Sequence, residues 1–177
     1  MSAYYFKHPT TILVAGPTGS GKTEFVSRAI EQKIFYPMPT HMQWVYGERQ
    51  VEIEAHHEDV EFLKDANIED IYESLDPNDS NLLVIDDQMS RERKYIEKLF
   101  TQGSHHKNLT VIMLVQNLFQ KELRTISLNS HYIVLMKTHV TELRFALLVS
   151  KCFRKTRDLL CKPMIMQRVA SNTVIWL

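Results

Sequence analysis

Eight consecutive residues near the N-terminus have the types and spacing of a phosphate-binding loop (P-loop). Glycines at the turning positions let backbone N–H groups approach phosphate oxygens closely. In this pattern the lysine brings a positive charge to the outer phosphates and the threonine hydroxyl is a ligand for Mg²⁺. The sequence therefore predicts a site for a nucleoside triphosphate with Mg²⁺. The residues, which fit G-x-x-x-x-G-K-[ST], are Gly16, Pro17, Thr18, Gly19, Ser20, Gly21, Lys22 and Thr23.

A second motif places two adjacent carboxylates at the end of an apolar run. Asp86 and Asp87 follow the residues 82–85, which read Leu-Leu-Val-Ile. Such a run predicts a central parallel strand, whose end lies at the same edge of the sheet as the P-loop. This is the Walker B pattern, in which Asp86 is expected to hold the Mg²⁺ shell and Asp87 to orient and deprotonate the attacking water. A second carboxylate there favours an ATPase over a GTPase or a small-molecule kinase.

A third apolar run, residues 109–115, ends in the amides Gln116 and Asn117. In additional-strand ATPases, the strand between the P-loop strand and the Walker B strand ends in a polar sensor residue. Gln116 falls at that position and is predicted to contact the γ-phosphate or the lytic water. Asn117 is interpreted as a cap for the next segment.

The elements that position these motifs alternate between strands and helices, which predicts a parallel sheet. We expect an α/β fold of the additional-strand (RecA-like, ASCE) P-loop NTPase type, with strand order 5-1-4-3-2 and flanking helices. The expected strands are residues 10–15, Gln43 to Tyr46, 81–86, 109–115 and His131 to Lys137. The expected helical segments are Lys22 to Lys33, Glu58 to Leu75, Arg91 to Gly103 and Val140 to Phe153.

Composition fits one globular α/β domain in a reducing compartment. The chain has 177 residues, of which 44% are hydrophobic and 24% charged, and only two cysteines. We find no signal peptide or membrane span, and therefore expect an intracellular protein with no membrane partner. Charge is asymmetric, because residues 48–79 carry twelve acidic and two basic side chains whereas residues 121–168 carry ten basic and three acidic. This polarity suits head-to-tail assembly of subunits or a basic surface that binds nucleic acid. The alternative interpretation is an acidic face and a basic face that are both only exposed to solvent.

Residues 10–138 resemble the genome-packaging ATPases of Polinton (Maverick) elements and adintoviruses, in the FtsK/HerA superfamily alongside poxvirus-type packaging ATPases. The resemblance is carried by the strings LFTQGSHHKN from Leu99, VIMLVQNLF from Val111 and RTISLNSHYIVLMK from Arg124. It implies an ATP-driven ring of identical subunits that pumps double-stranded DNA into a capsid, with capsid or portal components as further partners. It also implies a location in a virion or in the host nucleus or cytoplasm.

The chain departs from this family at two places. Gln102 stands where the family is expected to have a basic residue, and after Lys137 the likeness ends. We therefore divide the chain into an ATPase core, 1–138, and a helical, basic C-terminal extension, 139–177. Because the likeness ends after Lys137, one alternative is a fragment of a packaging ATPase that binds nucleotide but does not hydrolyse it. A small-molecule or nucleoside kinase, or a prenyl transferase acting on nucleic acid, is the other alternative.

Arg124 is a candidate for the arginine that a ring ATPase takes from a neighbouring subunit to neutralise charge on the γ-phosphate. It follows the predicted sensor strand, on an edge that can face the next subunit. A plain surface arginine is the alternative interpretation.

Overall fold

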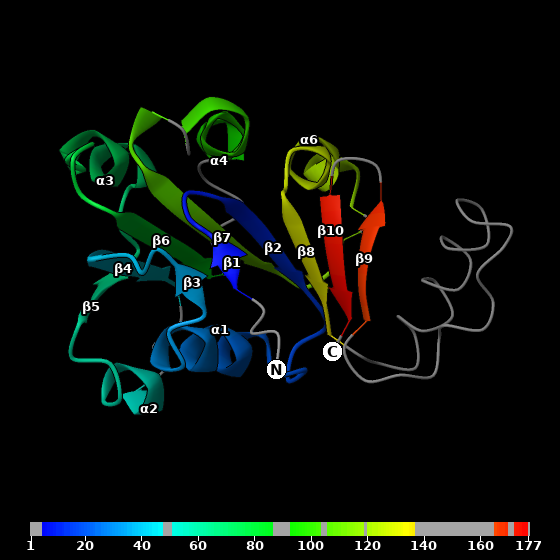
Figure 1. Cartoon of the computed structure of the whole chain (residues 1–177), viewed down its shortest axis with the longest axis horizontal. Coiled ribbons are helices and arrows are strands. Elements are labelled where there is room, and N and C mark those ends of the chain that lie inside the picture. Colours follow the sequence, from blue (N-terminus) through cyan, green and yellow to red (C-terminus); the bar gives the residue numbers. More distant parts are fainter. Residues whose placement is uncertain are drawn as a thin grey trace, which may run out of the picture.

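The computed structural model of the chain describes residues 5–47, 51–86, 93–103, 106–118, 120–136, 165–169 and 172–176. They form a mostly parallel β-sheet with helices on both faces (Figure 1). The elements in chain order are β1 (Phe6–Lys7), β2 (Thr11–Ala15), α1 (Lys22–Glu31), β3 (Phe35–Tyr36), β4 (His41–Tyr46), α2 (Val51–Glu54), β5 (Val60–Lys64), α3 (Ile68–Ser74), β6 (Asn81–Asp86), α4 (Arg93–Lys98), the π-helix η1 (Leu99–Gly103), β7 (Leu109–Val115), the 3₁₀-helix η2 (Lys121–Leu123), α6 (Arg124–Leu128), β8 (Tyr132–Leu135), β9 (Ile165–Val169) and β10 (Asn172–Trp176).

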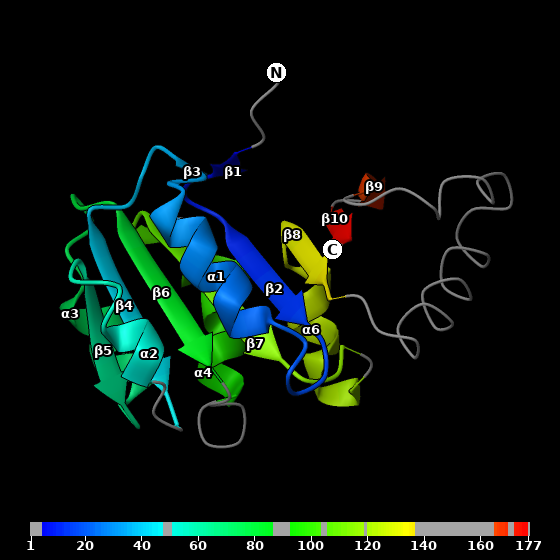
Figure 2. The same cartoon turned by 90° about the horizontal axis from the view of Figure 1, so that it is seen from below.

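The strand order of the large sheet is β5-β4-β6-β7-β2-β8-β10-β9. The five strands predicted from the sequence are β2, β4, β6, β7 and β8, and their order, β8-β2-β7-β6-β4, confirms the predicted 5-1-4-3-2. Every pair of neighbours among these five strands is parallel. Their carboxyl ends therefore meet at one edge of the sheet, where α1 also begins (Figure 2). The fold thus brings the ends of the predicted chemical motifs together.

The sheet is buried because its central strands are apolar on both faces. All residues of β2 and β7 are buried. On one face, Leu13 and Met113 pack in a core with Ile71, Ile96 and Ile126 of α3, α4 and α6. On the other face, alternate strand residues pack against α1. This double burial explains why the central strands read as continuous apolar runs.

The segment predicted as a helix from Glu58 to Leu75 is instead a strand followed by a helix. β5 pairs in parallel with β4 at the sheet edge, with Val60 opposite Met42. Charged side chains interrupt the apolar residues of β5, as is common in edge strands, and this conceals the strand pattern in the sequence. One of these charges has a structural partner, since Gln43 Nε2 donates to Glu61 Oε2 at 2.8 Å. α3 then begins after Asn67, whose side chain accepts from the backbone N–H of Glu69 and Asp70.

The C-terminal strands were not predicted from the sequence. β10 pairs in parallel with β8 and antiparallel with β9, so both strands extend the same sheet. The predicted helix from Val140 to Phe153 lies outside the described residues, and the domain boundary at residue 138 stays a prediction. In the part of the chain that the structure describes, we see no helix with the length and apolar character that crossing a membrane requires.

Candidate functional site

The P-loop connects the end of β2 to the start of α1 at the carboxyl edge of the sheet. Two of its glycines adopt left-handed backbone conformations, with φ of 74° at Gly19 and 85° at Gly21. Residues with side chains are strained in this region, so the turn requires glycine at both positions. The loop is tied to the sheet by its first residue, because the Gly16 N–H donates to the Val115 carbonyl at 3.0 Å.

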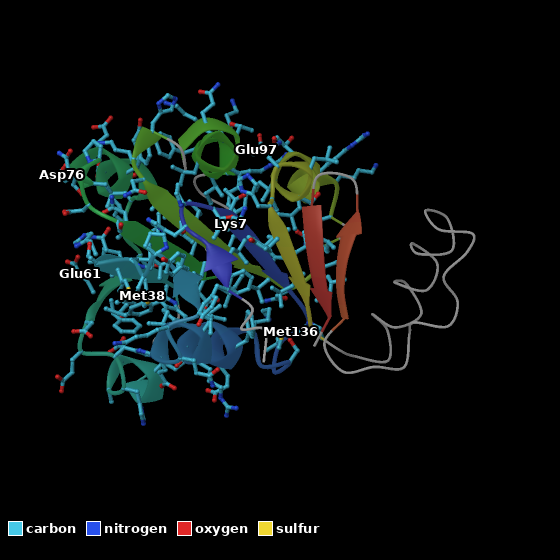
Figure 3. All side chains as sticks on the ribbon, in the orientation of Figure 1. Lys7, Met38, Glu61, Asp76, Glu97 and Met136 are labelled. Atoms are coloured by element: carbon cyan, nitrogen blue, oxygen red, sulfur yellow. The ribbon has the colours of Figure 1, made fainter. Side chains whose placement is uncertain are left out.

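Gly16 is required for a different reason, because neighbouring side chains approach its Cα too closely to leave room for a Cβ atom. A Cβ atom built at Gly16 would lie 2.6 Å from Ser20 Oγ and 2.7 Å from Met136 Cβ. Met136 follows β8, and its N–H donates to the Ala15 carbonyl at 2.9 Å. Figure 3 shows Met136 beside this loop. The conformation of the P-loop therefore depends on contact with the segment after β8.

We expect Gly16→Ala to lower the free energy of unfolding by about 1–3 kcal/mol, because the added methyl group overpacks a filled site. Gly19→Ala is the matched control, because its Cβ would meet nothing within 4 Å and would add only backbone strain, about 1 kcal/mol. Urea unfolding of the two variants measures the difference. Equal stability of Gly16→Ala and the wild type would contradict the close-contact explanation.

The start of α1 is suited to bind an anion. Gly21 is its N-cap and no side chain caps the first turn, so the N–H groups there are oriented toward the P-loop without a side-chain acceptor. Lys22 Nζ donates to the Pro17 carbonyl at 3.0 Å, so the ammonium group lies over the loop. Ser20 Oγ is buried and has no hydrogen-bond partner among the described residues. These features fit the phosphate groups of a nucleotide.

The predicted magnesium ligands lie together beside the P-loop. Asp86 is the last residue of β6 and is half-buried. Thr23 Oγ1, in the first turn of α1, donates to Asp86 Oδ2 at 3.4 Å. A hydroxyl and a carboxylate in this arrangement fit a hydrated Mg²⁺ that is bound mainly through phosphate oxygens.

Gln116 also lies near the P-loop, and its contact with the γ-phosphate or the lytic water stays a prediction. It follows Val115, the residue whose carbonyl accepts from the Gly16 N–H. β7 pairs with β2 on one side and β6 on the other, as a sensor strand requires. Gln116 is exposed, so its amide is accessible at the carboxyl edge.

Known proteins share this fold, as comparison with solved structures shows. The chain is similar to the genome packaging NTPase B204 of Sulfolobus turreted icosahedral virus 2, solved with ATP-γS, with a TM-score of 0.51, 11% identity, and 89% and 90% of the two chains covered. The chain has a P-loop NTPase fold. It is equally similar to the cytoplasmic domain of EssC, with a TM-score of 0.51 and 11% identity, but spans only 40% of that chain. No protein-family model matches, and no curated protein matches by sequence.

Two residues of the predicted nucleotide site are not placed with the others. Asp87 lies outside the described residues, so its role as general base stays a prediction. Arg124 is the first residue of α6 and is exposed. No contact joins Arg124 to the P-loop or to Asp86 among those that the structure describes, so its role stays a prediction.

One residue beside the candidate site belongs to no recognised motif, and the sequence analysis did not predict it. Glu54, the last residue of α2, lines a small pocket together with Thr23 and Asp86. The remaining lining residues are Trp44, Tyr46, Ile53 and Phe62. Two carboxylates and the threonine hydroxyl therefore share one largely aromatic pocket on the predicted magnesium side of the P-loop. The one available sequence signal was that Glu54 follows β4, the strand that pairs with β6.

Proposed function

We propose that this protein is an ATP-hydrolysing motor subunit that packages double-stranded DNA into a viral or transposon-encoded capsid. The proposal is carried by the Thr23–Asp86 contact beside a P-loop whose neighbouring strand, β7, is inserted between the two motif strands. The similarity in fold to a genome packaging NTPase supports it. The resemblance of three sequence strings to Polinton and adintovirus packaging ATPases also supports it, because these strings lie outside the motifs common to all P-loop proteins.

The residues of the site are assigned roles by their positions. Backbone N–H groups of the P-loop and of the first turn of α1 bind the phosphates, and Lys22 adds a positive charge. Thr23 and Asp86 hold Mg²⁺, which when bound neutralises charge on the β- and γ-phosphate oxygens. Asp87 accepts the proton of the attacking water, and Gln116 orients that water or the γ-phosphate.

The kinase alternative requires a second pocket for an acceptor molecule. Pockets for small molecules generally have volumes of about 300 Å³ or more. The pocket beside Thr23 and Asp86 has a cavity volume of about 10 Å³, which is room for about one water molecule. This pocket has no room for an acceptor nucleoside, so the kinase alternative requires an acceptor pocket elsewhere.

ATP turnover with and without duplex DNA tests the proposed function. We expect blunt linear double-stranded DNA to raise the rate several-fold and single-stranded DNA of equal length to raise it less, because the motor moves along duplex. Native mass measurement on the same sample should give a ring-sized homo-oligomer.

Two results would replace this proposal with an alternative. Nucleotide binding without turnover in the presence of duplex DNA would favour a catalytically idle fragment. A monomer that transfers phosphate to a small-molecule acceptor would favour a kinase.

A further inference from the structure

The segment that carries Glu54 is packed directly along the P-loop helix. Thr23, Ser27 and Glu31 are spaced four residues apart on α1, so they line one face of that helix. Glu54 shares a pocket with Thr23 at the beginning of this row. His57, three residues after Glu54, contacts the next two members of the row. The stretch from Val51 to His57, called the α2 segment below, therefore lies along about two turns of α1.

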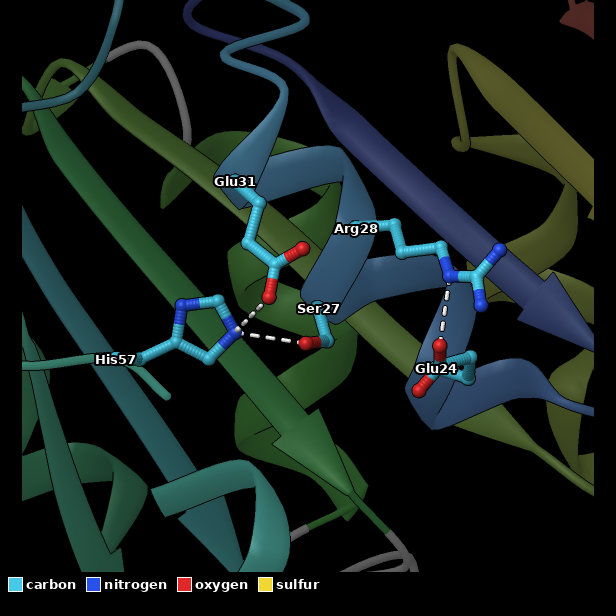
Figure 4. A network of polar contacts seen from close by, with 5 residues as sticks. All are labelled: Glu24, Ser27, Arg28, Glu31 and His57. Carbon is cyan, nitrogen blue, oxygen red and sulfur yellow. Dashed lines mark hydrogen bonds and ion pairs between the residues drawn. The ribbon is translucent and has the colours of Figure 1, made fainter. Parts of the chain in front are cut away.

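His57 fixes this alignment through buried contacts (Figure 4). Its Nε2 lies 2.7 Å from Ser27 Oγ and 3.9 Å from Glu31 Oε1. Both His57 and Ser27 are buried, at 7% and 5% exposed. A buried hydrogen bond is costly to leave unmade, so His57 holds the α2 segment against α1 at a fixed position along the helix. Glu54 is thereby kept beside Thr23.

The pocket that Glu54 enters has a distinctive chemistry. Trp44 and Phe62 stack with their ring centroids 5.7 Å apart and form its apolar wall. Asp86 and Glu54 bring two carboxylates to the same partly buried space. Carboxylate oxygens are suited to contact a hydrated divalent cation directly or through its water ligands. Mg²⁺ retains several water ligands when it binds with phosphates, and the pocket has room for about one of them.

We propose that Glu54 would hold a magnesium-bound water in the pocket that it shares with Thr23 and Asp86, and that His57 is the positioning residue that keeps Glu54 there. This inference rests on the proposed function, since it requires nucleotide and Mg²⁺ to bind between Thr23 and Asp86. It adds a carboxylate to the site from a segment outside the P-loop, Walker B and sensor motifs.

The Mg²⁺ dependence of nucleotide binding tests the inference without relying on turnover. ATP-γS affinity is measured by calorimetry over a series of Mg²⁺ concentrations and in EDTA. We expect Glu54→Gln to raise the Mg²⁺ concentration for half-maximal tight binding by about 10-fold or more, which is typical of losing an outer-shell metal partner. In EDTA its affinity should equal or exceed that of the wild type, because one negative charge near the phosphates is gone.

Glu58→Gln is the matched control. It removes the same charge four residues further along the chain, from an exposed position. Its Mg²⁺ midpoint should stay within about 2-fold of the wild type, since a solvated charge is largely screened. His57→Ala should shift the midpoint in the same direction as Glu54→Gln, and thermal unfolding shows whether the variants remain folded at the assay temperature.

The outcomes distinguish the inference from the proposed function. If the wild type binds ATP-γS with Mg²⁺ but Glu54→Gln has an unchanged midpoint, the role of Glu54 is wrong and the proposed function stands. If Glu58→Gln shifts the midpoint as much as Glu54→Gln, the effect is general electrostatics and the inference also fails. If the wild type does not bind nucleotide at any Mg²⁺ concentration, the proposed function and the inference fail together.

Discussion

Lys22→Ala is expected to remove measurable MgATP binding at micromolar protein concentrations. Lys22 Nζ lies over the P-loop, 3.0 Å from the Pro17 carbonyl, where an incoming phosphate can replace that carbonyl as its partner. Losing one member of a buried charge pair costs about 2–5 kcal/mol, or a factor of about 30 to several thousand in affinity. Calorimetric titration of the variant with MgATP measures this loss.

The fold should tolerate this change, which makes the binding result interpretable. The hydrogen bond from Lys22 to the Pro17 carbonyl is exposed, so its removal should cost the fold little stability. Lys33→Ala is the control, because Lys33 is exposed just beyond the other end of α1. It removes the same charge at a distance from the P-loop. Unchanged ATP affinity in Lys22→Ala would refute the phosphate-site assignment itself.

The site residues on the P-loop and at the strand ends could be predicted because their local chemistry is specific. A phosphate-binding turn requires left-handed glycines, and Gly19 and Gly21 have that conformation. A doubly buried strand must be apolar, which identified β6 and β7 as central strands of the sheet. In the structure β7 lies between β2 and β6. Once those strands are parallel and adjacent, Asp86 has to end beside Thr23, and the 3.4 Å contact follows.

Other parts of the fold depend on contacts between distant segments, which a single sequence does not record. β5 is an edge strand whose charged residues hide its periodicity. β9 and β10 join the sheet only through pairing with β8. Glu54 reaches the pocket because His57 packs on Ser27, thirty residues earlier in the chain. These elements are determined by tertiary packing rather than by local pattern.

Exposed charged residues lie toward both ends of the sheet, which bears on how subunits assemble. Glu61 of β5 and Asp76 after α3 lie toward the β5 edge (Figure 3). Lys121, Glu122 and Arg124 are exposed in the connection that leads from β7 to β8. We propose that this connection meets the β5 edge of the next subunit in a head-to-tail contact, which closes into a ring when the rotation between subunits permits.

Such a contact gives Arg124 a function that the single chain does not explain. Among the arginines whose side chains the structure describes, Arg28 and Arg93 pair with glutamates on their own helices, at 2.6 Å and 3.0 Å. Arg124, at the start of α6, is exposed as they are, but it has no ion pair among the residues that the structure describes. We propose that it completes the ATP site of the adjacent subunit by neutralising charge on the γ-phosphate.

Arg124→Ala should therefore lower turnover by about 10³-fold or more while leaving nucleotide binding nearly intact, as expected for an arginine supplied in trans. Lys121→Ala removes a nearby exposed charge and should change the rate little. Steady-state ATP hydrolysis, with calorimetric affinity on the same samples, measures both effects. A large loss of affinity in Arg124→Ala would place this arginine in the binding site of its own chain.

Mixing two inactive variants tests whether Arg124 acts between subunits. Arg124→Ala keeps an intact P-loop, and Lys22→Ala keeps an intact arginine, so an interface between them can combine both. A random one-to-one ring should recover about a quarter of the wild-type sites, since each active site needs one particular pairing of neighbours. Arg124→Ala mixed with Lys22→Ala/Arg124→Ala is the matched control and should remain inactive. Failure to recover activity, although native mass shows mixed oligomers, would mean that Arg124 does not serve a neighbouring site.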